Sequence, residues 1–127
     1  MTFQLSVTLR NNKQAQNNAT IGTSGVMKIF SGAEPANCAA SDPTGLLCTI
    51  TLPASPFGTA SGGAVALAGT WSGTASAGGT IASWRIYDGS AVCHMQGNTS
   101  DMTFNNTNVA NGQTVTVSSF TDTAGNA

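Results

Sequence analysis

Residues 80–97 read TIASWRIYDGSAVCHMQG, and this stretch contains the clearest signal for the fold. Asp88-Gly89 is a typical two-residue β-hairpin turn, so the sequence predicts antiparallel strands at 80–87 and 91–97. With that turn Trp84 lies opposite Cys93, and both strands agree on one register. One predicted face is apolar and contains Ala82, Trp84, Ile86, Ala91, Cys93 and Met95; the other contains Ser83, Arg85, Tyr87, Ser90, Val92, His94 and Gln96.

Cys93, His94 and Met95 are adjacent soft metal ligands, and His94 is the only histidine in the chain. Successive strand residues point to opposite faces, so the pleat separates His94 from its two neighbours. Cys-x-Met supplies too few ligands for a stable metal site. We therefore predict no metal and no cofactor, with Cys93 and Met95 in the core and His94 on the outer face beside Arg85 and Tyr87.

The rest of the chain also has a β pattern. Residues 2–10 alternate strictly between apolar and polar types, which predicts a half-buried strand. Further strands are predicted at 26–30, 46–52, 64–71, 101–104 and 114–121. In the first of these Met27 and Ile29 should face inward, and in the second Leu46, Cys48, Ile50 and Leu52 should share the apolar face. One short helix is expected near residues 11–22, capped by Asn11 or Asn12 and ended by Gly22. The fold class is thus a single all-β domain (1–127), an antiparallel β-sandwich of about eight strands with a jelly-roll-like arrangement.

Charged residues make up only 7% of the chain, with four Lys and Arg against five Asp and Glu. So few scattered basic groups argue against nucleic-acid binding and against attachment to anionic lipid. No apolar run approaches the roughly 20 residues of a membrane helix, and no signal-peptide pattern opens the chain. We expect synthesis without export, with Cys38, Cys48 and Cys93 as free thiols; whether any two approach each other is left open.

The sequence contains no clear pattern of a catalytic site. Serines, aspartates and His94 are present, but none has the G-x-S-x-G context of a hydrolase nucleophile. The glycine-rich stretches lack the lysine of a phosphate-binding loop, and no calcium-binding loop occurs. We predict that the protein is not an enzyme. Its aromatic residues offer one alternative, a sugar-stacking platform formed by Phe57, Trp71, Trp84 and Tyr87, although Trp84 is also assigned to the core.

Several segments together carry a family resemblance: FQLSVTLRNN, TIGTSGVMKIFSG, EPANCAA before LLCTITLP, FGTASGGAVALAGTW, WRIYDGSAVCHMQG, DMTFNNTNVANGQTVTVSSFT and a terminal GNA. In this order the chain resembles small virion structural proteins of tailed bacteriophages. The resemblance implies a β-sandwich capsid decoration (cement) protein, made in the bacterial cytoplasm and located on the phage head. Its implied partners are the major capsid protein and copies of itself as a homo-oligomer. The family provides no catalytic residue to carry over.

Interface candidates follow from expected exposure and loop length. They lie in the N-terminal arm, in loops 31–45 and 53–63, and on the polar hairpin face: Thr2, Arg10, Asn11, Glu34, Phe57, Arg85, Tyr87 and His94. The alternative function is a tail, tail-tip or fibre-associated protein that binds carbohydrate on the host surface.

Overall fold

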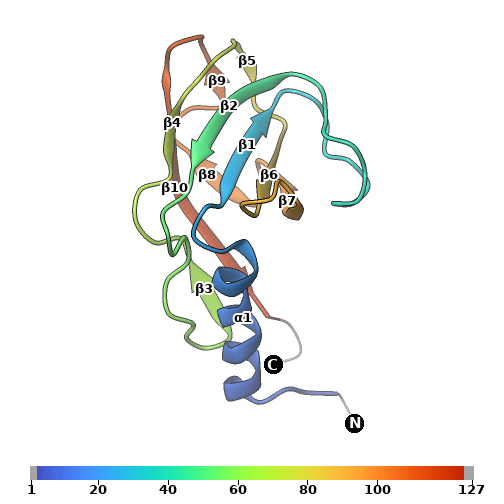
Figure 1. Ribbon diagram of the computed structural model, residues 1–127, viewed down its shortest axis with the longest axis vertical. Helices are drawn as coiled ribbons and strands as arrows, with labels where there is room; N and C mark the ends of the chain where they lie inside the picture. The colour runs from blue at the N-terminus through green and yellow to red at the C-terminus, as the bar shows by residue number, and fades with distance from the viewer. Residues whose placement is uncertain (1–2, 125–127) are drawn as a thin grey trace.

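The computed structural model describes residues 3–124, which form one helix and ten strands in an elongated arrangement (Figure 1). The helix is α1 (Val7–Ile21). The strands are β1 (Val26–Phe30), β2 (Leu46–Thr51), β3 (Ala64–Ala66), β4 (Ser72–Thr74), β5 (Gly79–Thr80), β6 (Ser83–Tyr87), β7 (Cys93–Asn98), β8 (Met102–Phe104), β9 (Asn108–Val109) and β10 (Thr114–Thr123).

The strands pair in two larger sheets and one small ladder. The first sheet has the order β2-β1-β6-β7, and the second is built on β10, which pairs in succession with β4, β8 and β3. β5 and β9 form the ladder at the end farthest from α1 (Figure 1). Every pairing is antiparallel, so the predicted all-β antiparallel sandwich is confirmed, while its jelly-roll-like order stays a prediction.

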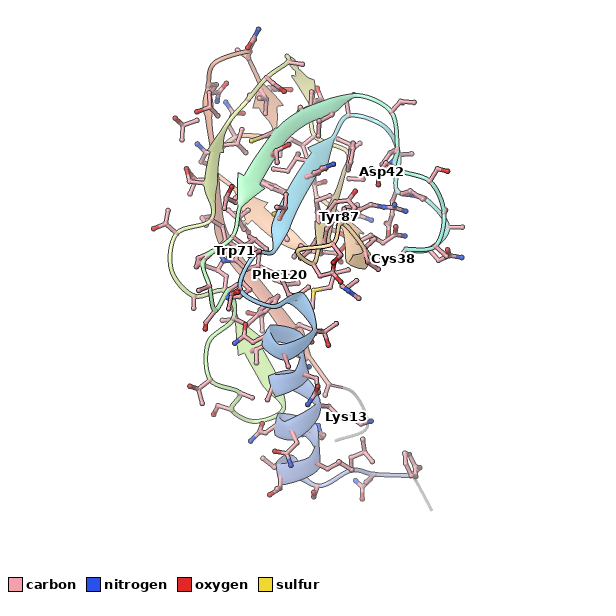
Figure 2. The ribbon with its side chains drawn as sticks, in the orientation of Figure 1. Lys13, Cys38, Asp42, Trp71, Tyr87 and Phe120 are labelled. Carbon is pink, nitrogen blue, oxygen red and sulfur yellow. The ribbon has the colours of Figure 1, made fainter. Side chains whose placement is uncertain are left out.

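Aromatic side chains fill the centre of the core. Phe120 of β10 contacts Phe57, Trp71 and Trp84, with ring centroids 6.1, 6.2 and 5.4 Å away. The Trp71 indole also donates a hydrogen bond to the Pro56 carbonyl over 3.2 Å. Figure 2 shows Trp71 and Phe120 near the middle of the molecule, between the sheets and the helix. Phe120 thus joins side chains from both sheets into one cluster.

β1 and β2 confirm two of the predicted strands and add one irregularity. Met27 and Ile29 are buried as expected. Ile29 pairs with Cys48, but Phe30 pairs with Leu46. Leu47 is therefore an extra residue in β2 and forms a β-bulge. The bulge buries Leu47 and leaves Leu46 40% exposed, so the predicted inward position of Leu46 is wrong.

The predicted strand at 2–10 is wrong, because α1 already begins at Val7. The side chain of Ser6 accepts a hydrogen bond from the Leu9 N–H at 3.1 Å, which makes Ser6 the N-cap. Gly22 ends the helix with φ 77°, as the sequence predicted, and its N–H bonds the Asn18 carbonyl. The helix is thus longer than expected, and its N-cap lies five or six residues before the predicted caps Asn11 and Asn12.

Polar residues dominate the docked face of α1, which explains the wrong prediction. Arg10 and Gln14 are buried, whereas Val7 and Leu9 are 52% and 44% exposed. The Arg10 guanidinium donates to the carbonyls of Gly62 and Ala124 at 3.1–3.2 Å. The apolar alternation that predicted a strand therefore belongs in part to a helix, and the buried face of this helix is polar and docks through hydrogen bonds.

The predicted register of the β6–β7 hairpin is also wrong. Its turn is five residues long (88–92), and Asp88 Oδ1 accepts the N–H groups of Ser90 and Val92 at 2.8 and 3.1 Å. Tyr87 pairs with Cys93 but Ile86 pairs with Met95, so His94 is an extra, bulged residue.

The bulge changes which face Cys93 occupies. Met95 packs against the core as predicted. Cys93 instead lies opposite Tyr87 on the outer face, so its predicted place beside Trp84 is wrong. His94 is exposed, but its Nε2 pairs with Asp88 Oδ2 at 2.8 Å rather than lying beside Arg85.

Candidate functional site

Loop 31–45 covers the outer face of the first sheet and is fastened there by Arg85. The Arg85 side chain is only 2% exposed. Its guanidinium donates to the carbonyls of Asn37 and Ala40, both at 3.0 Å, and to Asp42 Oδ1 at 2.9 Å. The Gln96 Oε1 atom accepts two further hydrogen bonds from it. We call these residues, together with Tyr87, the Arg85 cluster.

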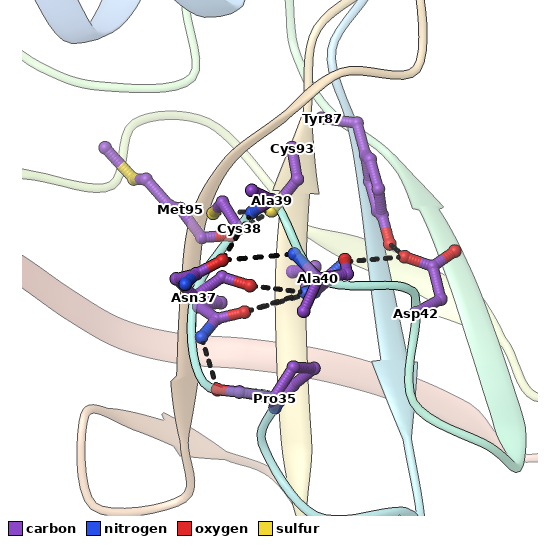
Figure 3. Close-up of polar contacts among 11 residues, drawn as sticks. Pro35, Asn37, Cys38, Ala39, Ala40, Asp42, Tyr87, Cys93 and Met95 are labelled. Carbon is purple, nitrogen blue, oxygen red and sulfur yellow. Dashed lines mark hydrogen bonds and ion pairs between the residues drawn. The ribbon is translucent and has the colours of Figure 1, made fainter.

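The sequence builds this cluster from two directions. Cross-strand pairing places Arg85 of β6 next to Gln96 of β7. From the loop, Asn37 Oδ1 accepts the N–H groups of Ala39 and Ala40 and so holds a tight turn. Figure 3 shows this turn, with Asn37, Ala40 and Asp42, in front of the face of the sheet. Gln96 then donates its amide to the Pro35 carbonyl at 2.7 Å and closes the cluster.

Asp42 connects the guanidinium to a phenol. The Tyr87 hydroxyl donates to Asp42 Oδ1 at 2.5 Å. This bond, together with the Arg85 guanidinium, lowers the pKa of the Asp42 carboxyl. Burial and the same hydrogen bond raise the pKa of Tyr87. Both shifts favour an ionised Asp42 and a protonated Tyr87, and their hydrogen bond helps to hold loop 31–45 on the sheet.

Two cysteines meet at the edge of the cluster. Cys38 of the loop and Cys93 of β7 are both partly buried, and their Sγ atoms lie 2.6 Å apart (Figure 3). Burial, followed by the contact with Cys38, raises the pKa of Cys93 to about 12. Cys48 lies elsewhere, in the core, with no exposed surface. The sequence left this pairing open, and the bulge at His94 is what creates it.

An open cavity of about 540 Å³ lies between the two sheets, beside β7. Its lining combines the core residues Trp84, Met95 and Phe120 with three carboxylates, those of Glu34, Asp101 and Asp122. Each carboxylate already accepts a hydrogen bond, from Asn98 or Asn17. Within residues 3–124, no three His, Cys, Asp or Glu side chains are grouped to hold a metal ion.

The predicted exposure is wrong for four of the interface candidates. Arg10, Phe57, Arg85 and Tyr87 are 7%, 2%, 2% and 5% exposed. Arg10 docks α1, Phe57 lies in the core, and the other two belong to the Arg85 cluster. These side chains hold the fold together and have little surface left for a partner.

The remaining candidates differ in their environment. Glu34 and His94 are exposed, as expected. Asn11 is half-buried, and its Oδ1 accepts the Gly63 N–H at 2.7 Å. Thr2 lies outside the described residues.

The predicted sugar-stacking platform is also wrong, because its four aromatic rings are not exposed on the surface. Phe57, Trp71, Trp84 and Tyr87 are all at most 5% exposed, so none offers an open ring face. Carbohydrate-binding platforms need such faces in contact with solvent.

The exposed apolar residues that sequence reasoning missed lie at the start of the chain. Phe3, Val7 and Leu9 are 71%, 52% and 44% exposed. They lie at and before the first turn of α1, the part of the helix farthest from the first sheet (Figure 1). Their alternation had assigned them to the core. These three side chains are exposed because the helix begins directly after Ser6 instead of a half-buried strand forming there. We call them the N-terminal apolar patch.

Comparisons with protein-family models, with curated proteins and with solved structures find no match for this chain. Across residues 3–124 we also find no helix with the length and apolar character needed to cross a membrane.

Proposed function

We propose that this protein is a virion structural protein, a capsid decoration (cement) protein that binds the outer surface of a bacteriophage head. In this role it contacts the major capsid protein and copies of itself, and it stabilises the shell. Because it binds the assembled lattice in preference to free subunits, mass action shifts the equilibrium toward the intact head.

The observation that carries the proposal is the N-terminal apolar patch. Phe3, Val7 and Leu9 supply three of the five large hydrophobic side chains that are well exposed in the described chain. Val7 and Leu9 are two residues apart on α1 and point to different sides of the helix, but all three side chains lie at the N-terminal end of the molecule, and exposed apolar surface of this kind is typical of protein–protein contact sites. Only 7% of the chain is charged, so contacts of its surface with a neighbour require little desolvation of ions.

Two further features support a structural role. The Arg85 cluster fixes loop 31–45 against the first sheet, so this loop presents a pre-formed surface to a neighbour. The family resemblance of the sequence segments points the same way. The carbohydrate-binding alternative has lost its aromatic platform and receives no such support.

The test uses phage heads that lack the protein, titrated with purified protein. We expect saturable binding in a fixed ratio to the major capsid protein, and a higher temperature of head rupture once the protein is bound. Absence of the protein from purified wild-type heads would overturn the proposal, and so would a failure to bind deficient heads.

Variants locate the contact. The triple variant F3S/V7S/L9S removes the N-terminal apolar patch and should weaken binding to deficient heads at least about tenfold. The matched control L46S/V92S removes the other two exposed large hydrophobic side chains and should bind within about twofold of wild type. Equal losses in both variants would contradict the assignment of the patch.

A further inference from the structure

The two partly buried cysteines form a pair that the rest of the fold holds together. Cys38 comes from loop 31–45 and Cys93 from β7, 55 positions later in the chain. Their Sγ atoms lie 2.6 Å apart, close to the roughly 2.05 Å of a disulfide bond. Two sulfurs from distant segments meet here without any bond between them.

Neighbouring hydrogen bonds keep the two backbones in place. On one side of Cys38, Gln96 donates to the Pro35 carbonyl; on the other, Arg85 donates to the Ala40 carbonyl. Arg85 also bonds the Asn37 carbonyl, immediately before the cysteine. Both Arg85 and Gln96 belong to the β6–β7 hairpin that carries Cys93. Bond formation therefore needs no large movement of either segment.

We propose that Cys38 and Cys93 form an oxidation site, where a disulfide cross-links loop 31–45 to β7 when the protein meets a low-molecular-weight disulfide. The inference does not rest on the proposed function. It selects one pair among three thiols, because Cys48 is fully buried in the core and is therefore closed to an external oxidant.

The chemistry is two successive thiol–disulfide exchanges. One protein thiolate attacks a sulfur of the oxidant, forms a mixed disulfide and releases one small thiol. The second protein thiolate attacks the protein sulfur of that mixed disulfide, forms the Cys38–Cys93 bond and releases the second small thiol. Two protein thiols are thereby oxidised, the oxidant is reduced to two thiols, and these carry away the two protons.

The raised pKa of Cys93 sets the pH dependence of this reaction. A thiolate is the attacking species, and burial keeps Cys93 protonated at neutral pH. The guanidinium of Arg85 favours its thiolate but does not offset burial. The rate of cross-linking should therefore rise as the pH is raised from 7 to 9.

The test treats the folded protein with oxidised glutathione and maps the cross-link by mass spectrometry. Cleavage before aspartate separates the three cysteines into peptides 1–41, 42–87 and 88–100. We expect a reducible link between 1–41 and 88–100, one remaining free thiol, and a mass about 2 Da lower than that of the reduced protein. Three unmodified thiols, a link to 42–87, or links only between molecules would each overturn the proposal.

Stability provides a second readout that does not depend on peptide mapping. Closing a long loop restricts the unfolded chain, so oxidation should raise Tm by about 10 °C, and a reductant should reverse the rise. The control variant C48S should keep the oxidation-dependent shift, whereas C93S should lose it. A shift of the same size in C93S, or loss of the shift in C48S, would contradict the proposal.

Discussion

The guanidinium of Arg10 occupies the space that a side chain at position 63 would need. A Cβ atom added to Gly63 would lie 2.5 Å from both Cζ and Nη2 of Arg10. The φ of Gly63 is also positive, at 78°. Through this contact α1 docks on the segment that leads into β3, so the glycine and the buried arginine depend on each other.

The first prediction compares two adjacent glycines. Gly62 also has a positive φ, 58°, but no atom lies within 4 Å of an added Cβ. Gly62→Ala should therefore lower the free energy of unfolding by about 1 kcal/mol, the cost of the backbone conformation alone. Gly63→Ala should lower it by at least about 1 kcal/mol more, because Arg10 must also move. Equal effects of the two substitutions in urea unfolding would show that α1 does not need this contact.

The second prediction concerns Asp42 and pH. Its pKa in the folded state lies below the unfolded value of about 3.9, because Tyr87 and Arg85 favour the ionised carboxylate. This contribution to stability is fully present above the unfolded pKa and is lost as the pH falls through the folded one. Asp42→Asn should thus cost about 1–2 kcal/mol at pH 7, a value reduced for the 44% exposure of the carboxylate side chain.

The measurement for Asp42 is urea unfolding of both proteins from pH 7 down to pH 2. The difference between wild type and Asp42→Asn should be constant above about pH 5 and should shrink as the folded protein takes up the proton. Glu34→Gln, an exposed carboxylate in the same loop, serves as the control and should change stability by less than about 0.5 kcal/mol. A difference that stays constant down to pH 2 would contradict the assigned role.

The third prediction concerns Phe120, which contacts three aromatic rings. Phe120→Ala should lower the free energy of unfolding by about 3–5 kcal/mol, because it leaves a cavity in the core. Phe3→Ala removes the same side chain at a 71% exposed position and should change stability by less than about 0.5 kcal/mol. Thermal unfolding of both variants tests this, and similar costs at the two positions would show that the aromatic cluster is not the centre of the core.

Seven of the eight strands expected from the sequence are present, and the exception is the strand predicted at 2–10, where α1 begins instead. Short apolar alternation fits a strand, but it is equally compatible with a helix whose buried face is polar. Arg10 and Gln14 are four residues apart and face inward, a helical period that hydrophobicity alone does not reveal. Ser6 is a favourable N-cap residue, and it indicates the start of the helix more accurately than the apolar alternation does.

The candidate site was predictable only in part. Arg85, Tyr87 and Gln96 were correctly placed on one face, but that face was expected to meet solvent or a partner. Loop 31–45 covers it instead, and no local pattern indicates where a loop of this length folds back. Since Asp42 and Asn37 are more than 40 residues from Arg85, their meeting depends on tertiary structure.

The amino-acid sequence by itself determined the β class, most strand positions and the end of the helix at Gly22, because these depend on residues close together in the chain. Tertiary structure decided the two bulges, the burial of Arg10 and Arg85, and the meeting of Cys38 with Cys93. The bulge at His94 illustrates the reason: one extra residue puts Cys93 on the outer face, while Met95 and Gln96 keep the faces that the sequence predicted. That choice is made by the packing of distant segments, whose hydrogen bonds and buried area outweigh the local preference for a two-residue turn.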